Sequence, residues 1–128
     1  MNRVLVVDDE EDVLDLVKTV LVGNGYEVFT ATTGEEGLVK AVKIKPDLII
    51  LDLVMPGISG LEVCRLLKSK TEFDKVPILV MSVLDREIDH KYVHKVGADD
   101  FLHKPFDIEE LLLTLDKLQS KINPTKSD

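Results

Sequence analysis

The chain has 128 residues, 45% of them hydrophobic, which suits one domain with a buried core and argues against a disordered protein. Its formal net charge of -8 makes it a poor candidate for holding nucleic acid through phosphate contacts. Cys64 is the single cysteine, so no intrachain disulfide can form, and no apolar run approaches the roughly 18 residues of a membrane span.

The first residues run directly into a strand pattern and leave no room for a signal peptide. Together with the single cysteine, this pattern leads us to expect a cytoplasmic domain without membrane contact. After that start, short apolar segments rich in β-branched residues alternate with segments whose apolar residues recur at helical spacing. The predicted strands are 3–7, 26–31, 47–51, 77–81 and 99–103. Five helices are predicted. The first begins at 13 and ends at the sequence 23–25, the second spans 34–44, and the third follows 59 and includes 61–68. The fourth spans 85–96, and the last includes 108–118.

Capping signals mark two of the helix starts. Thr33 and Ser59 each precede a helix, and Glu36 and Glu62 follow three residues later, as in a capping box. The apolar stripes predict which helical residues face the core. The expected core residues are Val13, Leu14, Val17, Val20, Leu21, Leu38, Ala41, Val42, Leu61, Cys64, Leu67, Ile108, Leu111, Leu112, Leu115 and Leu118, whereas Leu113 falls outside its stripe.

This regular alternation predicts parallel strands joined by right-handed crossovers, with helices on both faces of one sheet. The carboxyl ends of parallel strands share one edge, where ligands usually bind in such folds. Polar residues end four of the predicted strands: Asp8-Asp9, Asp52, Ser82 and Lys104. We therefore expect three carboxylates, a hydroxyl and an ammonium group to meet at this edge.

Carboxylates placed this close together raise one another's pKa, and a divalent cation relieves their repulsion. Mg²⁺, or Mn²⁺ in its place, prefers oxygen ligands. We expect Asp9 and Asp52 to bind the ion directly, Asp8 to bind through water, and the Val54 carbonyl to complete the protein ligands. One oxygen of Asp52 then remains free to attack a phosphoryl group, whose charge Lys104 and the Ser82 hydroxyl would neutralise.

These residues, in this order and on these strand ends, resemble the receiver domain of two-component response regulators. The resemblance covers nearly the whole chain and is carried by Asp8-Asp9, Asp52, Met55-Pro56, Gly60, Ser82, Gly97-Ala98-Asp99 and Lys104-Pro105-Phe106. It implies a flavodoxin-like (βα)5 fold, a doubly wound parallel sheet with strand order 2-1-3-4-5. The expected domain spans residues 1–122, and 123–128 are expected to form a polar tail or the start of a linker.

The resemblance also implies a function for this site. Asp52 would accept a phosphoryl group from a sensor histidine kinase or a phosphotransfer protein, with Mg²⁺ bound, and Lys104-Pro105 would be a cis peptide. Ser82 would follow the phosphoryl group and Phe101 would turn inward. The surface of helix four, strand five and helix five would then change and control an output domain or effector.

The same surface is where we expect a partner, or a second phosphorylated copy, to bind. Leu113 and Tyr92 are candidate contacts, because both are predicted to face outward. Thr114 stands where the winged-helix branch of the family usually has an arginine, which argues against the ion-paired dimer of that branch. Val54 and Leu84 are apolar at two positions that influence water access, so we expect slow self-dephosphorylation in a switch that is not otherwise an enzyme.

Several alternatives are weaker or stay open. A dehalogenase-type phosphatase would need a second acid at Val54, and a flavin carrier would need a Ser/Thr/Gly-rich loop after the first strand. His90 and His94 have the spacing of a surface metal pair, but two solvated helix residues are the simpler interpretation. A receiver-like scaffold that acts without phosphorylation stays open, as do the cognate kinase, the output and whether the chain is a whole regulator or a part of one.

Overall fold

The computed structural model describes residues 2–83, 95 and 97–122, and within this part five parallel strands form one sheet. The strand order is β2-β1-β3-β4-β5, which confirms the predicted topology. The strands are β1 (Arg3–Val7), β2 (Glu27–Ala31), β3 (Leu48–Asp52), β4 (Ile78–Ser82) and β5 (Asp100–His103). β3 is central, paired with β1 on one side and with β4 on the other.

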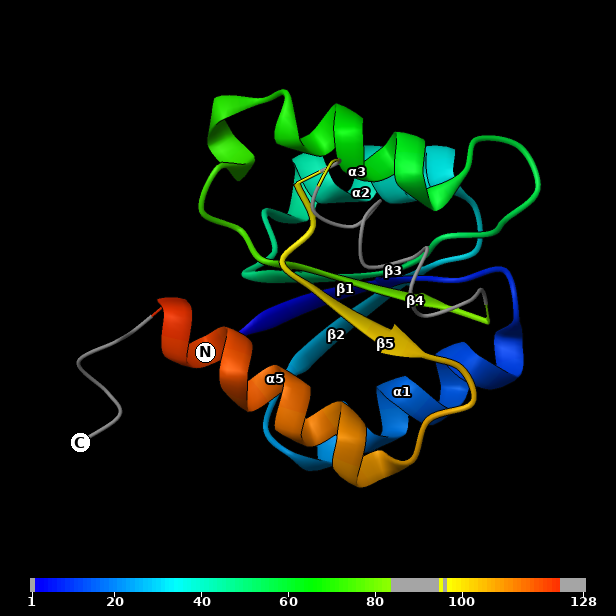
Figure 1. Cartoon of the computed structure of the whole chain (residues 1–128), viewed down its shortest axis with the longest axis vertical. Helices are drawn as coiled ribbons and strands as arrows, with labels where there is room; N and C mark the ends of the chain where they lie inside the picture. Colours follow the sequence, from blue (N-terminus) through cyan, green and yellow to red (C-terminus); the bar gives the residue numbers. More distant parts are fainter. Residues whose placement is uncertain (1, 84–94, 96, 123–128) are drawn as a thin grey trace.

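Helices cover both faces of the sheet, as Figure 1 shows. α1 (Glu11–Gly23) and α5 (Ile108–Ile122) lie on one face, and α2 (Gly34–Ile44) and α3 (Gly60–Lys68) lie on the other. A short 3₁₀ turn, η1 (Thr71–Phe73), follows α3. The helix predicted at 85–96 and the tail predicted at 123–128 lie outside the described residues, apart from Lys95.

Two hydrophobic clusters, one on each face, make up the core. Alternate residues of each inner strand enter opposite clusters, as with Ile49 and Ile50 of β3. All five residues of β3 and of β4 are buried. Burial on both faces explains why these strands read as continuous apolar runs. None of the described helices has the length and apolar character needed to span a membrane.

Strand pairing places two site residues inside strands. Asp52 pairs with Met81, and Ser82 pairs with His103, so both polar residues belong to the sheet ladder instead of following it. The ladder fixes the backbone of Asp52 and Ser82, which fixes where their side chains leave the strand ends. The predicted strands began one residue too early at 26, 47, 77 and 99, because the observed strands begin at 27, 48, 78 and 100.

The prediction that Val42 and Ile108 face the core is wrong, because their side chains are 45% and 47% exposed. α2 instead contacts the sheet through small residues. A Cβ added at Gly37 would lie 2.9 Å from a methyl group of Val7. The buried residues of α2 are Gly34, Gly37 and Ala41, and Val42 lies outside this buried row. The other predicted core residues of the helices are buried or half-buried, and Leu113 is exposed as predicted.

The caps form only in part as predicted. The hydroxyls of Thr33 and Ser59 accept hydrogen bonds from the backbone N–H groups of Glu36 and Glu62. The Glu36 carboxylate, however, accepts from the N–H of Thr32, not from that of Thr33. The Glu62 carboxylate pairs with Arg65 on its own helix, so the second half of the predicted box is absent there.

Candidate functional site

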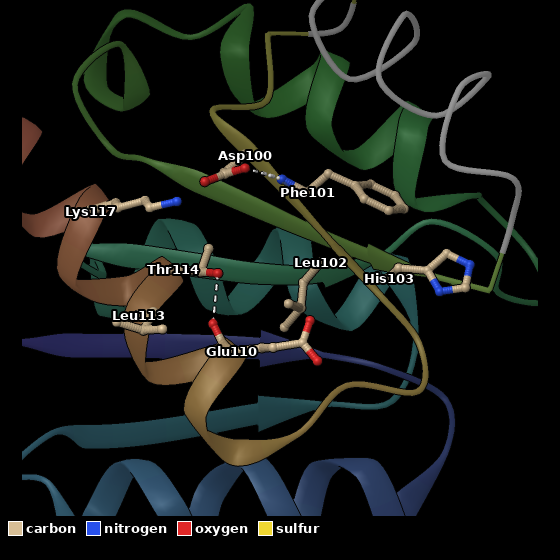
Figure 2. Close-up of a pocket in the computed structure, with 8 residues that line it drawn as sticks. All are labelled: Asp100, Phe101, Leu102, His103, Glu110, Leu113, Thr114 and Lys117. Carbon is tan, nitrogen blue, oxygen red and sulfur yellow. Dashed lines mark hydrogen bonds between the residues drawn. The ribbon is translucent and has the colours of Figure 1, made fainter.

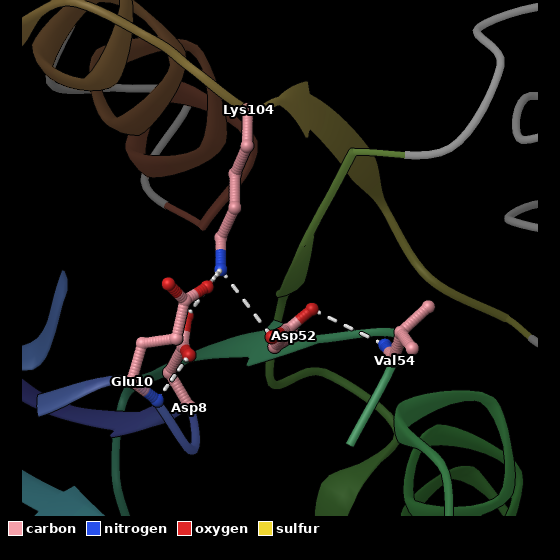
Figure 3. Close-up of polar contacts among 5 residues, drawn as sticks. All are labelled: Asp8, Glu10, Asp52, Val54 and Lys104. Atoms are coloured by element: carbon pink, nitrogen blue, oxygen red, sulfur yellow. Dashed lines mark hydrogen bonds and ion pairs between the residues drawn. The ribbon is translucent and has the colours of Figure 1, made fainter.

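The carboxyl edge of the sheet holds the buried polar residues that the sequence predicted there. Asp8 follows β1, Asp52 ends β3, Ser82 ends β4 and Lys104 follows β5, and all four are buried. Figure 3 shows the side chains of Asp8, Asp52 and Lys104 pointing toward one another from three strand ends. Buried charges need partners, since an isolated ion inside a protein is costly. These residues supply such partners to each other.

Lys104 connects the carboxylates. Its Nζ donates to Asp8 Oδ2 at 2.7 Å, to Glu10 Oε1 at 3.2 Å and to Asp52 Oδ2 at 3.3 Å (Figure 3). Burial by itself lowers the pKa of Lys104, but the hydrogen bond to Asp8 and the charges of Asp52 and Asp8 outweigh it and raise the pKa above its usual value. The ammonium group therefore stays charged at neutral pH.

Asp52 has one oxygen toward Lys104 and one toward the loop after β3. Its Oδ1 accepts a hydrogen bond of 3.2 Å from the backbone N–H of Val54. Burial, and then the charge of Asp8, raise the pKa of Asp52 from 3.8 to about 6, against the opposing effects of Lys104 and the Val54 N–H. The site is thus short of positive charge for the carboxylates it contains.

Asp8 fixes the backbone that follows β1. Its Oδ1 accepts from the backbone N–H of Glu10 at 2.9 Å, while its Oδ2 binds Lys104. This local bond places Glu10 at the N-cap of α1, and it brings the Glu10 carboxylate to the Lys104 ammonium. The sequence pattern assigned no role to Glu10. The available signal was an acid at position 10, two residues after Asp8, because an aspartate side chain can accept a hydrogen bond from the N–H two residues on.

The β4 and β5 ends are connected through their backbones. The N–H of Lys104 donates to the Ser82 carbonyl at 2.8 Å, and the Lys104-Pro105 bond is cis, as predicted. Phe101 is half-buried and packs against the core cluster on the α2–α3 face, with its ring centroid 6.4 Å from that of His103.

A cleft of about 220 Å³ opens at this edge. It is lined by Asp9, Glu10, Asp52, Val54, Val83 and Lys104. Asp9 lies exposed at the rim, and Val54 is 54% exposed. The cleft gives a small group access from solvent to the otherwise buried Asp52.

The carboxylates at this edge fit a hard divalent cation. One oxygen each from Asp8, Glu10 and Asp52 lies within 4.8 Å of the others, and Mg²⁺ takes such oxygen ligands while it retains several waters. The carboxylate of Asp9 is outside this group of three. Direct ligation by Asp9 and by the Val54 carbonyl stays a prediction.

Gly60 lets α3 approach the acceptor strand. Its N–H donates to the Leu53 carbonyl at 2.9 Å, and a Cβ at this position would lie 1.9 Å from the Asp52 carbonyl oxygen. Only glycine fits such an approach. The glycine at this position, one of the residues that carry the family resemblance, therefore has a steric cause in the position of Asp52.

Residues 4–116 match the family described as the response regulator receiver domain. The chain belongs to this family. A receiver domain is a phosphoacceptor switch of two-component signalling, and the flavodoxin-like fold implied by the sequence is confirmed. Receiver domains in general act with histidine kinases and with output domains.

Known relatives of this receiver domain include longer regulators and solved receiver structures. It is 43% identical over 110 residues to the alkaline phosphatase synthesis transcriptional regulatory protein PhoP of Bacillus subtilis, covering 86% of this chain and 45% of PhoP. The chain thus spans about half the length of the curated relatives it matches.

Among solved structures, chemotaxis protein CheY4 of Vibrio cholerae is 36% identical, with a TM-score of 0.88 over 92% of this receiver domain and 98% of CheY4. Response regulator TrrA of Thermotoga maritima, solved in complex with Mg²⁺-BeF, is 38% identical, with a TM-score of 0.82 over 92% of this chain and 99% of TrrA.

Proposed function

We propose that this receiver domain accepts a phosphoryl group on Asp52 from a sensor histidine kinase or a phosphotransfer protein. The observation that carries the proposal is the position of Asp52: a buried carboxylate at the end of the central strand, 3.3 Å from an ammonium group and open to a cleft. An Asp52 oxygen would form the new P–O bond. The P–N bond of the phosphohistidine would break, with its electron pair leaving on the histidine nitrogen.

Mg²⁺, or Mn²⁺, would be held by Asp8, Asp9, Asp52 and the Val54 carbonyl, and it would neutralise charge on the carboxylates and the phosphoryl oxygens. TrrA, which was solved with Mg²⁺-BeF, supports a metal in this family. The nearby carboxylate of Glu10 adds to the negative field that attracts the cation.

The remaining work is done by residues of the chain. The Val54 N–H and Lys104 orient the two Asp52 oxygens before transfer. Lys104 and the Ser82 hydroxyl would then bind the phosphoryl oxygens. We propose that Ser82 moves with them, and that Phe101, two residues before the strand partner of Ser82, changes its packing in response.

The signal would leave through the face made by the segment 85–96, β5 and α5. A second cleft of about 290 Å³ lies on the described part of this face, between β5 and α5 (Figure 2). Leu113 on its α5 side is 61% exposed. We propose that an output domain, an effector or a second phosphorylated copy binds here. Alanine at both Leu113 and Tyr92 should then weaken self-association or partner binding of the phosphorylated protein; unchanged association would contradict this assignment.

Intact-mass spectrometry tests the acceptor. The protein is incubated with acetyl phosphate and Mg²⁺, beside Asp52→Asn and, as a matched control, Asp15→Asn on the exposed face of α1. We expect one phosphoryl group on the wild type and on Asp15→Asn, none on Asp52→Asn, and none without Mg²⁺. No gain on the wild type would instead favour the scaffold that acts without phosphorylation. We propose that the phosphoryl transfer takes place in the cytoplasm. We assign no direct nucleic-acid contact to this domain, whose net charge is -8.

A further inference from the structure

Every N–H of the Lys104 ammonium group already has a carboxylate within reach. An ammonium group has three donors, and the three acceptors are Asp8, Glu10 and Asp52 at 2.7, 3.2 and 3.3 Å. A phosphoryl oxygen that binds Lys104 must therefore replace one of these carboxylates.

The three carboxylates differ in the free energy needed to separate them from Lys104. The side chains of Asp8 and Asp52 are 0% and 6% exposed, whereas that of Glu10 is 60% exposed. A buried carboxylate that loses its partner keeps the full desolvation penalty. An exposed one is hydrated by water instead, and its ion pair contributes little. Glu10 is thus the acceptor that Lys104 loses most easily.

The backbone around Glu10 lets its side chain leave without disturbing the site. Glu10 is the N-cap of α1, but its side chain makes no capping bond, and its N–H is held by Asp8. The carboxylate lies between two openings, because Glu10 lines both the cleft at Asp52 and a neighbouring cleft of about 310 Å³. It can turn into solvent while Asp8 keeps the backbone in place.

We propose that Glu10 is the exchangeable partner of Lys104: it holds the ammonium group in the unphosphorylated domain and is displaced by the phosphoryl oxygen. Glu10 is a positioning residue, since it acts through Lys104. Its negative charge competes with the incoming anion, so it sets how readily the site binds a phosphoryl group. This inference rests on the function proposed above.

Beryllofluoride, a stable mimic of the phosphoryl group, allows a test by equilibrium binding. Its dissociation constant is measured by titration at saturating Mg²⁺, after a Mg²⁺ titration of each protein, for the wild type, Glu10→Gln and Glu11→Gln. Glu11 is the matched control: it is one residue away in the first turn of α1, it is exposed, and the structure shows no ion pair for it among the described residues. We expect beryllofluoride to bind Glu10→Gln about threefold more tightly than the wild type, with a clearly smaller change in Glu11→Gln.

A spectroscopic measurement distinguishes exchange from a general charge effect. The side-chain carboxyl carbon of Glu10 in the wild type should shift in the NMR spectrum on beryllofluoride binding, toward the position of a solvated glutamate such as Glu11. Three outcomes would each overturn the inference while leaving Asp52 as the phosphoryl acceptor. These are an equal gain in beryllofluoride affinity in Glu10→Gln and Glu11→Gln, no gain in affinity in Glu10→Gln, or a Glu10 resonance that does not shift on binding. A wild type that binds no beryllofluoride would overturn the proposed function and this inference with it.

Discussion

Lys104 donates its shortest hydrogen bond to Asp8, with 2.7 Å between Nζ and Oδ2, although the two residues lie 96 positions apart in the sequence. The distance from Lys104 Nζ to Oδ2 of Asp52, the predicted phosphoryl acceptor, is 3.3 Å. The lysine therefore does two things in the unphosphorylated domain. It neutralises a fully buried carboxylate and stays within reach of the acceptor.

Removing the lysine should destabilise the domain. Lys104→Met leaves Asp8 and Asp52 buried without their cation, and loss of one partner from a buried ion pair costs about 3 kcal/mol. Urea unfolding in metal-free buffer measures this cost, with Lys75→Met, an exposed residue before β4, as the control. Added Mg²⁺ should recover part of the loss. An unfolding free energy equal to that of the wild type in metal-free buffer would contradict the role of Lys104 as the counter-ion.

The raised pKa of Asp52 predicts a pH dependence with a definite sign. Its pKa is about 6 in the fold and 3.8 ordinarily, so between these values the folded state holds a proton that the unfolded state releases. Stability contributed by the protonated carboxyl is present below about pH 4 and lost as the pH rises to about 6; the shift corresponds to about 3 kcal/mol.

Asp52→Asn should lose less stability than the wild type across this pH window in metal-free buffer, and it should be the more stable protein at pH 7. Urea unfolding between pH 4 and pH 8 measures the difference, with Asp15→Asn as the control. Parallel curves of unfolding free energy against pH for the wild type and Asp52→Asn would show that burial does not raise the pKa of Asp52.

Gly60 should not tolerate a side chain. In Gly60→Ala the new Cβ would meet the Asp52 carbonyl oxygen at 1.9 Å, so the start of α3 or the end of β3 must move. We expect a loss of about 3 kcal/mol and slower phosphorylation of Asp52. Gly23→Ala is the control: nothing lies within 4 Å of its Cβ, and alanine in a helix gains up to about 1 kcal/mol. Equal stability of the two variants would refute the steric argument.

Alanine substitutions at Leu113 and Leu115 of α5 should differ in their effect on stability, because one residue is on the surface and the other is in the core. Leu115 is fully buried, and its replacement by alanine should cost about 3 kcal/mol. Leu113 is 61% exposed, and the same change should alter stability by less than about 0.5 kcal/mol. Thermal unfolding of both variants measures this. A large loss in Leu113→Ala would mean that the residue is part of the core and not a free contact surface.

The apolar Val54 side chain should slow loss of the phosphoryl group. It lines the cleft at Asp52 and offers no group that orients an attacking water. We expect a half-life of minutes or longer on the isolated domain, shortened in Val54→Asn and unchanged in Val39→Asn, an exposed control on α2. The decay is followed by intact mass after removal of acetyl phosphate. A wild-type half-life of seconds would count against this expectation.

The sequence predicted most of the fold because its signals are local. Apolar runs, helical periodicity and the caps at Thr33 and Ser59 depend on residues a few positions apart, and each element that they predicted within the described residues is present. The error at Val42 arose because periodicity gives the width of an apolar stripe but not which of its residues contact the sheet; Ile108 is the first residue of α5, at the end of its stripe. At α2, Gly37 allows close contact with Val7 of β1, whereas Gly34 lies against Ile58 and Val63.

The residue types at the strand ends determined the site, since Asp8, Asp52, Ser82 and Lys104 each follow or end a predicted strand, and parallel strands bring their carboxyl ends together. The tertiary structure alone decided how these groups pair. Whether Lys104 is nearer to Asp8 or Asp52, and whether Glu10 turns toward it, depends on distances across the sheet and on the turn after β1. Electrostatic interactions at a few ångströms depend on such distances, and the order of residues along the chain does not contain them.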